Sequence, residues 1–328
     1  MKKLFFILFI FFIIGCGEGS RNFSSNHIVS EINISNVQYQ KMLKVGINVN
    51  WAIFPKIIKI YDSSFPSYFA KEGFSTIRLR FDFTDKILDV FDYNKTKYVN
   101  FLKKLVNDCE ANNLHIVLAD GAEEFKNNPN EETLNTLVNN WILIAKAFKS
   151  YPKNLSYNLI IEPGKGLNRK NDILNEFYQK VYKEIRKIDK TRILLWAPDR
   201  RSNPKLLDET WYPENDEYIM AEWHNYAAGP KEGYEEDIPK MVENVKIWEE
   251  KTHIPTWFGA WMPGNYNHGD DYNLTEQIKF ATFLTKELKK AGIPFAINAD
   301  TQFFDYENRK WNNRYPVVKA IIKTYYEN

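Results

Sequence analysis

Short apolar runs alternate with longer amphipathic segments along most of this chain. The runs are rich in β-branched residues, have the length of buried strands, and cover residues 45–49, 76–79, 115–118, 159–161, 193–196, 218–220, 256–258 and 294–297. Between most of them, apolar residues recur every three or four positions, as in amphipathic helices, over residues 98–111, 131–148, 171–188, 238–251 and 275–291. This alternation predicts an α/β fold in which the βα units close into a single (β/α)8 barrel. A doubly wound open sheet is the alternative, but the chain lacks the glycine-rich phosphate turn typical of that fold.

The amino-terminal residues follow a different pattern. A basic start, an apolar run over residues 4–14 and then Gly15 and Cys16 are typical of a secretory signal, and the run is short for a membrane-spanning helix. The sequence Ile13-Ile14-Gly15-Cys16 resembles the lipobox of bacterial lipoproteins, which implies cleavage before Cys16 and lipidation of its sulfur. An ordinary cleaved signal with an incidental cysteine is the alternative. We therefore expect an exported protein that is anchored by lipid to a membrane of the bacterial cell envelope.

Composition then limits the remaining possibilities. The formal net charge is +2 and no basic stripe stands out, so nucleic acid is not an expected partner. Cys109, the only other cysteine, lies in a helical segment, and no Cys/His cluster has zinc-binding spacing. We expect no metal, no cofactor and a monomeric protein. Because residues 17–40 are polar and aperiodic, the predicted organisation is a signal peptide at 1–15, lipidated Cys16 with a flexible tether at 16–40, and a barrel at 41–328.

Candidate site residues follow from the rule that chemistry in such a barrel sits at the carboxyl ends of the strands. Glu162 comes directly after the fourth predicted strand. Glu222, His224 and Tyr226 follow the sixth, and period-two alternation places them on one face. Acids, a histidine and aromatic rings at one barrel mouth suit a carbohydrate, because rings stack on sugar faces and polar groups bind hydroxyls. The same reasoning adds Asn298 and Asp300 after the eighth strand, and Trp51 or Trp261 as rings that face the cleft.

These segments resemble glycoside hydrolase family 5, a cellulase family of retaining (β/α)8 enzymes. The similarity covers about residues 44–315 and is carried by 46–48, 73–78, 141–145, 148–155, 161–163, 175–185, 192–194 and 310–312. It implies hydrolysis of a β-linked polysaccharide or oligosaccharide. Glu162 matches the family's general acid/base. Arg78 matches its motif arginine, and His224 and Tyr226 match its strand-six pair, so these three are substrate-binding candidates.

The sequence also departs from the family pattern. Ile161 stands where the family has asparagine, Gly121-Ala122 replaces a histidine pair, and Asn298 replaces a tryptophan. Most importantly, the strand that should end in Gly-Glu reads Gly259-Ala260, so Ala260 occupies the position of the nucleophile. A methyl group cannot form a glycosyl-enzyme ester, and double displacement is therefore not open to the matching residue.

Three interpretations follow. In the first, the chain is a hydrolase in which Glu222 or Asp300 supplies a second carboxylate, about 5–5.5 Å from Glu162 for retention or about 6.5–9.5 Å for inversion. In the second, it is a carbohydrate-binding surface lipoprotein that has lost catalysis. In the third, Ala260 is an engineered substitution.

Several of these residues also fit purely structural roles. Glu162 could cap a helix at a βα turn, since acids favour that position. His224 could be a buried, hydrogen-bonded core residue. Arg78 could pair with Glu162, and Glu222 could pair with Arg78 or Arg80.

Overall fold

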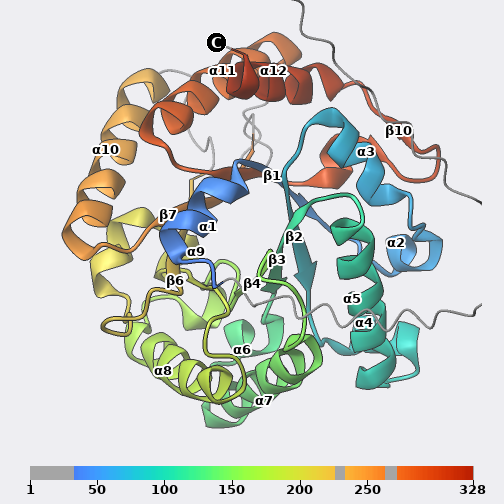
Figure 1. The fold of residues 1–328 in the computed structure, drawn as a ribbon, viewed down its shortest axis with the longest axis vertical. Coiled ribbons are helices and arrows are strands. Elements are labelled where there is room, and N and C mark those ends of the chain that lie inside the picture. Colours follow the sequence, from blue (N-terminus) through green and yellow to red (C-terminus); the bar gives the residue numbers. More distant parts are fainter. Residues whose placement is uncertain (1–32, 226–232, 263–271, 328) are drawn as a thin grey trace, which may run out of the picture. The chain divides into compact units, whose positions relative to one another are not determined.

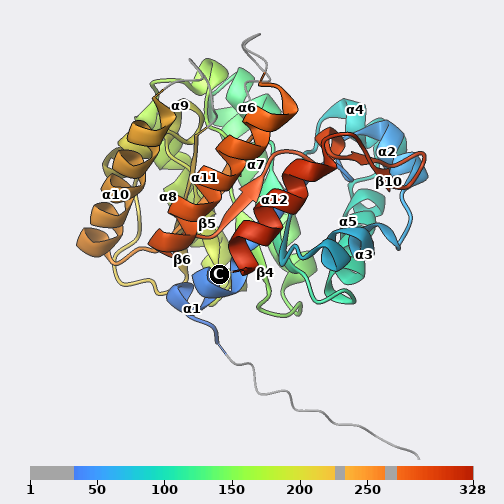
Figure 2. The same ribbon diagram turned by 90° about the horizontal axis from the view of Figure 1, so that it is seen from above.

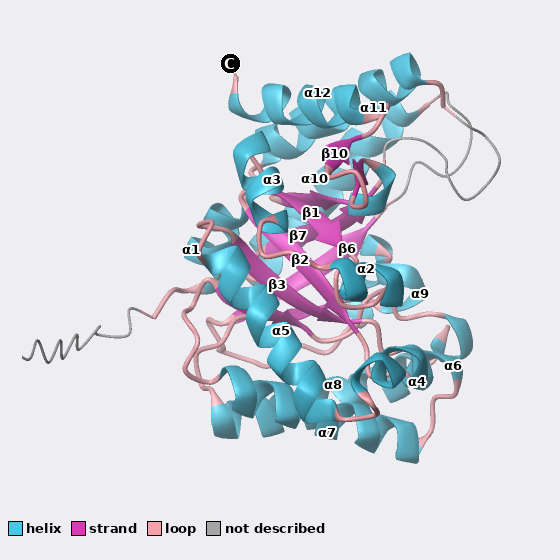
Figure 3. Ribbon diagram, turned by 90° about the vertical axis from the view of Figure 1, so that its right-hand side faces the viewer, coloured by secondary structure: helices cyan, strands magenta, loops and turns pink. Residues whose placement is uncertain are grey.

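The computed structural model describes residues 33–225, 233–262 and 272–327. In these ranges the parallel strands close into a barrel in sequence order, and helices surround it (Figures 1 and 3). The predicted single (β/α)8 barrel is confirmed. The strands are β1 (Val45–Val49), β2 (Thr76–Phe81), β3 (His115–Asp120), β4 (Leu155–Asn158), β5 (Leu194–Trp196), β6 (Ile219–His224), β7 (Thr256–Trp261) and β8 (Phe295–Ile297).

The fourth strand lies earlier than the sequence pattern predicts. It covers residues 155–158 instead of 159–161, because the polar Ser156 and Asn158 are buried inside the barrel, where they find hydrogen-bond partners. The apolar residues that follow still continue the path of the strand. Leu159 donates a backbone hydrogen bond to Leu195, and Ile161 donates one to Asp120.

The covering helices bury one face each, as their periodicity predicts. α7 (Glu131–Phe148) and α8 (Asn171–Ile188) have the predicted bounds, and α5 (Lys95–Glu110), α10 (Tyr234–Thr252) and α11 (Leu274–Ala291) differ by a few residues. α12 (Tyr315–Tyr326) lies beside α11 (Figure 2). The short elements are α2 (Pro55–Ile60), α3 (Phe65–Glu72), α4 (Asp85–Leu88), α6 (Glu123–Asn127), α9 (Asp199–Ser202), the 3-10 turns at 89–91, 165–167, 204–209 and 300–302, and a two-stranded sheet of β9 (Phe304–Asp305) and β10 (Lys310–Trp311). None of the helices in the described ranges is both long and apolar enough to cross a membrane.

A further helix, α1 (Asn36–Leu43), closes the end of the barrel at which the strands begin, opposite α6 and α9 (Figure 2). Tyr39 and Leu43 are fully buried, and the Tyr39 hydroxyl lies 3.0 Å from Oγ of Ser156 in β4. Both side chains pack against one layer of the barrel interior, formed by Val117, Ile193, Leu195, Met220, Trp257 and Ala296.

This helix corrects the predicted boundary of the tether. The folded unit begins at Asn33, so residues 33–40 belong to it and not to a flexible segment. Polarity misled the prediction, because the side chains of Asn36 and Gln40 are buried and satisfied. Their amides donate to the carbonyl oxygens of Ile219 and Thr256, at 2.8 and 2.9 Å.

Candidate active site

Glu162 lies at the mouth of the barrel, just beyond β4. Its φ of +49° is in the left-handed region, and non-glycine residues held in such conformations cluster at functional sites. The carboxylate oxygen Oε1 lies 2.9 Å from Nδ1 of His224, at the end of β6. The His224 contact fixes the carboxylate. Because the side chain is 28% exposed, Glu162 is also accessible to a ligand.

A buried chain of charged groups stands behind His224. Its Nε2 contacts Oε1 of Glu222, which forms an ion pair with Arg78 of β2 at 2.6 Å. The amide of Asn158 joins both partners: Oδ1 accepts from Arg78 at 2.6 Å, and Nδ2 donates to Glu222 at 3.3 Å. The side chains of Arg78 and Glu222 are 1% and 0% exposed. The structure thus brings four predicted site residues, from Glu162 to Arg78, into one hydrogen-bonded chain.

The charges in this chain stabilise one another. Burial raises the pKa of Glu222, but the Arg78 guanidinium and the His224 ring outweigh burial and hold that pKa below its usual value. Burial lowers the pKa of His224, whereas Glu222 and Glu162 raise it, and the net direction is upward. Glu222 therefore stays ionised, and His224 stays protonated over a wider pH range than a free imidazole. A protonated ring donates from both nitrogens, one to each carboxylate.

Glu222 fits against β7 because residue 259 is glycine. A Cβ at Gly259 would overlap Oε1 of Glu222 and lie 2.7 Å from its Cγ. The carbonyl of Gly259 also accepts a hydrogen bond from Arg78 at 3.1 Å. The next residue, Ala260, is 1% exposed and lies in register with His224. The strand end where the family nucleophile is expected thus carries a buried methyl group.

Asp300, the other expected second carboxylate, is fully buried and bonded on both oxygens. Oδ2 accepts from the Asn50 backbone at 3.1 Å and from the Tyr306 hydroxyl at 2.5 Å. Oδ1 accepts from the Asn50 side chain at 2.9 Å and from the Thr301 backbone at 2.8 Å. Burial raises the pKa of Asp300 to about 6. These bonds join the loops after β1 and β8, and they are at odds with a carboxylate that activates water in an open cleft.

Both tryptophans expected at the cleft are fully buried in the core. Trp51 packs against Phe69 and donates from Nε1 to the Tyr306 hydroxyl at 2.5 Å. Trp261 packs against Phe280. The prediction that either ring faces a sugar was therefore wrong. A barrel and its helices bury wide rings as readily as a cleft exposes them, and residue type alone does not separate the two.

The remaining predictions for the site have mixed outcomes. Asn298, half-buried just beyond β8, accepts a hydrogen bond from Asn48 at 3.4 Å, and its contact with substrate stays a prediction. Tyr226 and Cys16 lie outside the described residues, so substrate binding by the first and lipidation of the second also stay predictions.

An acidic pair at the ends of β2 and β3 was missed from the sequence. Asp82 directly follows β2 and Asp120 ends β3, and both are buried. Burial raises the pKa of Asp82 to about 6, and burial and Asp82 together raise the pKa of Asp120 well above its ordinary value. The signal was an acid after an apolar run, the same signal that identified Glu162. Within the described ranges, no group of three or more His, Cys, Asp or Glu side chains is arranged to hold a metal ion.

Lys126 of α6, also missed, supports the turn that carries Glu162. Its side chain is 7% exposed and pairs with Glu123 at 2.9 Å. Nζ donates to the carbonyl of Ile161 at 3.1 Å, while the Ile161 N–H donates to the Asp120 carbonyl at 2.8 Å. Both backbone groups of the residue before Glu162 are therefore held.

Comparison with known proteins gives the following similarities. Residues 40–299 match the family described as Cellulase (glycosyl hydrolase family 5). No curated protein sequence matches the chain significantly. The fold is similar to that of endoglucanase Cel5A from the hyperthermophilic Thermotoga maritima, with a TM-score of 0.74 and 20% identity over 88% of this chain and 100% of that one. A second structure, described as an endoglucanase, has a TM-score of 0.74 and 22% identity over 88% of this chain and 99% of its own. The cellulose synthase subunit Z (CcsZ) from Clostridioides difficile has a TM-score of 0.69 and 20% identity over 87% of this chain and 100% of its own. At these identities, the structural likeness establishes a shared fold.

Proposed function

Because the chain belongs to glycosyl hydrolase family 5, we propose that it hydrolyses a β-linked polysaccharide or oligosaccharide with Glu162 as the general acid. The observation that carries the proposal is the partly exposed Glu162 carboxylate at the barrel mouth, 2.9 Å from Nδ1 of His224. The endoglucanases of similar fold support a β-linked glycan as the substrate.

In this role Glu162 takes a proton from His224 through the hydrogen bond that joins them. It gives that proton to the glycosidic oxygen as the bond to the anomeric carbon breaks, and a water molecule forms the new bond to that carbon. The proton that this water gives up returns through Glu162 to His224, which restores the starting state. Glu222 keeps the ring protonated, and Arg78 keeps Glu222 ionised. The buried chain then serves as a proton reserve behind the acid.

We assign Glu222 to positioning His224 and not to the attack on the sugar. Glu162 and Glu222 bind opposite nitrogens of the same imidazole ring. The ring therefore fills the space between the two carboxylates. An inverting pair needs that space for the sugar and a water molecule, with the carboxyl groups about 6.5–9.5 Å apart.

A non-catalytic carbohydrate-binding role is the second candidate. It is favoured by the methyl group at Ala260 together with the burial of Glu222 and Asp300. Three carboxylates were expected to act in the reaction, and Glu162 is the one among them whose side chain is exposed.

Release of reducing ends from a panel of β-linked glycans separates the two candidates. The mature protein is compared with Glu162→Gln and with Glu124→Gln, an exposed glutamate on α6 that serves as the matched control. A hydrolase should lose roughly 10²–10⁴-fold in rate in the first variant and nothing in the second. No release by any form, with glycan binding retained, would favour the binding role. The anomer of the first product reports retention or inversion.

Ala260→Glu tests the vacant nucleophile position. A carboxylate restored beside His224 should introduce or enhance retaining activity. No change in rate or in product anomer would count against the assignment of residue 260 to that position.

We also propose that the protein is exported and anchored through lipid on Cys16. Cells that express the full chain or Cys16→Ser are fractionated and probed for the barrel. The wild type should partition with membranes and the variant with the soluble fraction. Equal partitioning of the two would contradict the anchor.

A further inference from the structure

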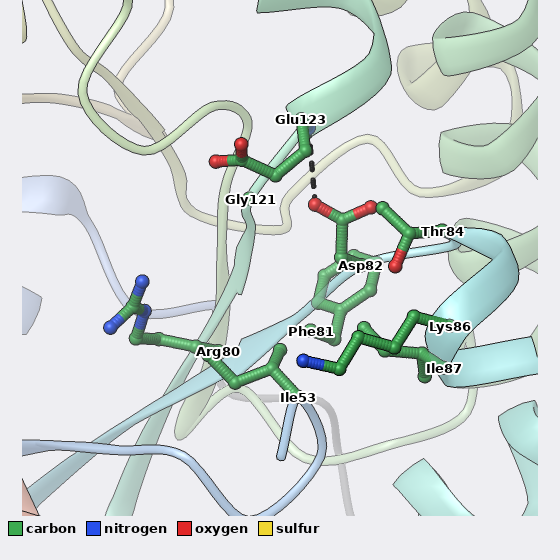
Figure 4. A pocket seen from close by; sticks show the side chains of 9 residues that line it. All are labelled: Ile53, Arg80, Phe81, Asp82, Thr84, Lys86, Ile87, Gly121 and Glu123. Atoms are coloured by element: carbon green, nitrogen blue, oxygen red, sulfur yellow. Dashed lines mark hydrogen bonds between the residues drawn. The ribbon is translucent and has the colours of Figure 1, made fainter. Parts of the chain in front are cut away.

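A cavity lies near the barrel mouth, between the loops that follow β1, β2 and β3 (Figure 4). Its volume is about 200 Å³, below the roughly 300–1,000 Å³ of pockets that enclose drug-sized ligands. A cavity of this size suits one sugar residue or substituent and not a longer chain. It is lined by Ile53, Arg80, Phe81, Asp82, Thr84, Lys86, Ile87, Gly121 and Glu123.

Two cationic side chains line this cavity without an ion-pair partner among the described residues. Arg80 of β2 donates from Nη1 to Oδ1 of Asn50 at 3.1 Å, and its Nε is buried without a hydrogen-bond partner. Asn50 in turn holds Asp300 at 2.9 Å, so an amide separates that carboxylate from Arg80. Lys86 of α4 is exposed. In Figure 4 the nitrogens of Arg80 and Lys86 lie below the carboxylates that line the same cavity.

Of those two carboxylates, that of Glu123 is compensated by ion pairs, and that of Asp82 has a raised pKa. Glu123 forms ion pairs with Lys126, at 2.9 Å, and with Lys165. Asp82 accepts a hydrogen bond from the Glu123 backbone at 3.1 Å, and burial raises the pKa of Asp82 to about 6. The other charged groups around Asp82 are Asp120, Glu123 and Lys126. Below pH 6 Asp82 is mostly neutral, and the uncompensated charge of the cavity is positive.

We propose that this cavity binds the carboxylate of an acidic sugar, so that the glycan recognised by the protein carries uronic acid residues. The planar Arg80 guanidinium suits two parallel hydrogen bonds to a carboxylate, and Lys86 adds a point charge at the rim. Ile53 and Phe81 supply apolar wall beside them. The inference rests on the proposed function in glycan recognition and adds a charge requirement that a neutral glycan does not meet.

Calorimetric binding of two matched ligands tests this inference. One is a cello-oligosaccharide, and the other is the same oligosaccharide oxidised at C6 to uronic acids. Both are titrated at pH 5.5 and low salt into mature Glu162→Gln protein, so that turnover does not interfere. The uronate should bind about tenfold more tightly, equivalent to about 1.4 kcal/mol. The preference should shrink in high salt, which screens charges near the surface.

Variants of the two cationic residues test whether this cavity causes the preference for the uronate. Lys86→Gln changes an exposed side chain without risk to folding, and Arg80→Gln removes the guanidinium; each should reduce the preference severalfold. Lys183→Gln, an exposed lysine of α8, should leave it unchanged. Equal affinity for both ligands would overturn the inference while the proposed function stands. Binding of neither would overturn both, and a preference that survives in the Arg80 and Lys86 variants would overturn the assignment to this cavity.

Discussion

Replacing Glu222 by glutamine tests whether the buried ion pair holds the site together. The substitution keeps the shape of the side chain and removes its charge, which leaves Arg78 buried without its carboxylate partner. Removing one partner of a buried pair generally costs about 3–5 kcal/mol. Arg78 retains the oxygens of Asn158 and Gly259 as acceptors, so we expect the lower end, about 3 kcal/mol. Against a typical total of about 5–15 kcal/mol the variant should still fold, with Tm lowered by roughly 5 °C for a folded unit of this size.

The pH dependence of this loss identifies its origin. The pKa of His224 is raised in the folded state, so its contribution to stability is full below the unfolded pKa and is lost as pH rises through the folded one. The pKa of Glu222 is lowered, so its contribution is present above the unfolded pKa and is lost as pH falls. The difference between wild type and Glu222→Gln should therefore be largest near pH 5–6.5 and shrink towards both pH 3 and pH 9.

Urea unfolding followed by circular dichroism, repeated across this pH range, measures the difference. Glu249→Gln is the matched control, because Glu249 is also buried but pairs with Lys246, whose side chain is 36% exposed and can be rehydrated. We expect the control to lose about 1 kcal/mol. Equal losses in the two variants, or a loss from Glu222→Gln that does not vary with pH, would refute the reasoning.

Three further changes have defined outcomes. Gly259→Ala drives a methyl group into the Glu222 carboxylate, so its thermal unfolding should show a loss at least as large as that of Glu222→Gln; an unchanged Tm would contradict the packing. Tyr39→Phe removes the bond to Ser156 and should cost about 1 kcal/mol in urea unfolding, whereas Tyr39→Ala should cost about 3–5 kcal/mol through the cavity that it opens. Asp82 has its pKa raised from 3.8 to about 6, so its contribution to stability is full below pH 3.8 and is lost as pH rises through 6. Asp82→Asn cannot ionise, and unfolding measurements should show it gaining up to about 3 kcal/mol on wild type between pH 4 and pH 8; a difference that stays constant with pH would count against it.

Local periodicity was enough to predict the barrel. The predicted bounds of α7 and α8 agree with the structure because each presents a continuous apolar stripe over five turns. The fourth strand was misplaced and α1 was missed for one shared reason. Ser156 and Asn36 are polar residues whose partners come from distant parts of the chain, and such partners leave no local trace in the sequence.

Part of the candidate site could also be predicted from the sequence. The position of Glu162 after a strand, and the shared face of Glu222 and His224, followed from strand geometry. The role of Glu222 did not, because it depends on a buried arginine that lies 144 positions earlier in the sequence and on a glycine in the next strand. The prediction for the two tryptophans failed because a large apolar ring is buried wherever the fold has space for it, and the sequence does not show where that space lies.

The position of α1 also determines how the barrel would present itself to its surroundings. The described chain enters at the end where the strands begin, marked by α1 in Figure 2. Glu162 follows the carboxyl end of β4 and so lies at the other end. If Cys16 carries lipid as proposed, the stretch from there to Asn33 reaches at most roughly 60 Å when fully extended. The lipid would then be connected to the barrel through its closed end, opposite the mouth that carries Glu162. A long glycan could then reach the mouth without meeting the point at which the tether joins the barrel.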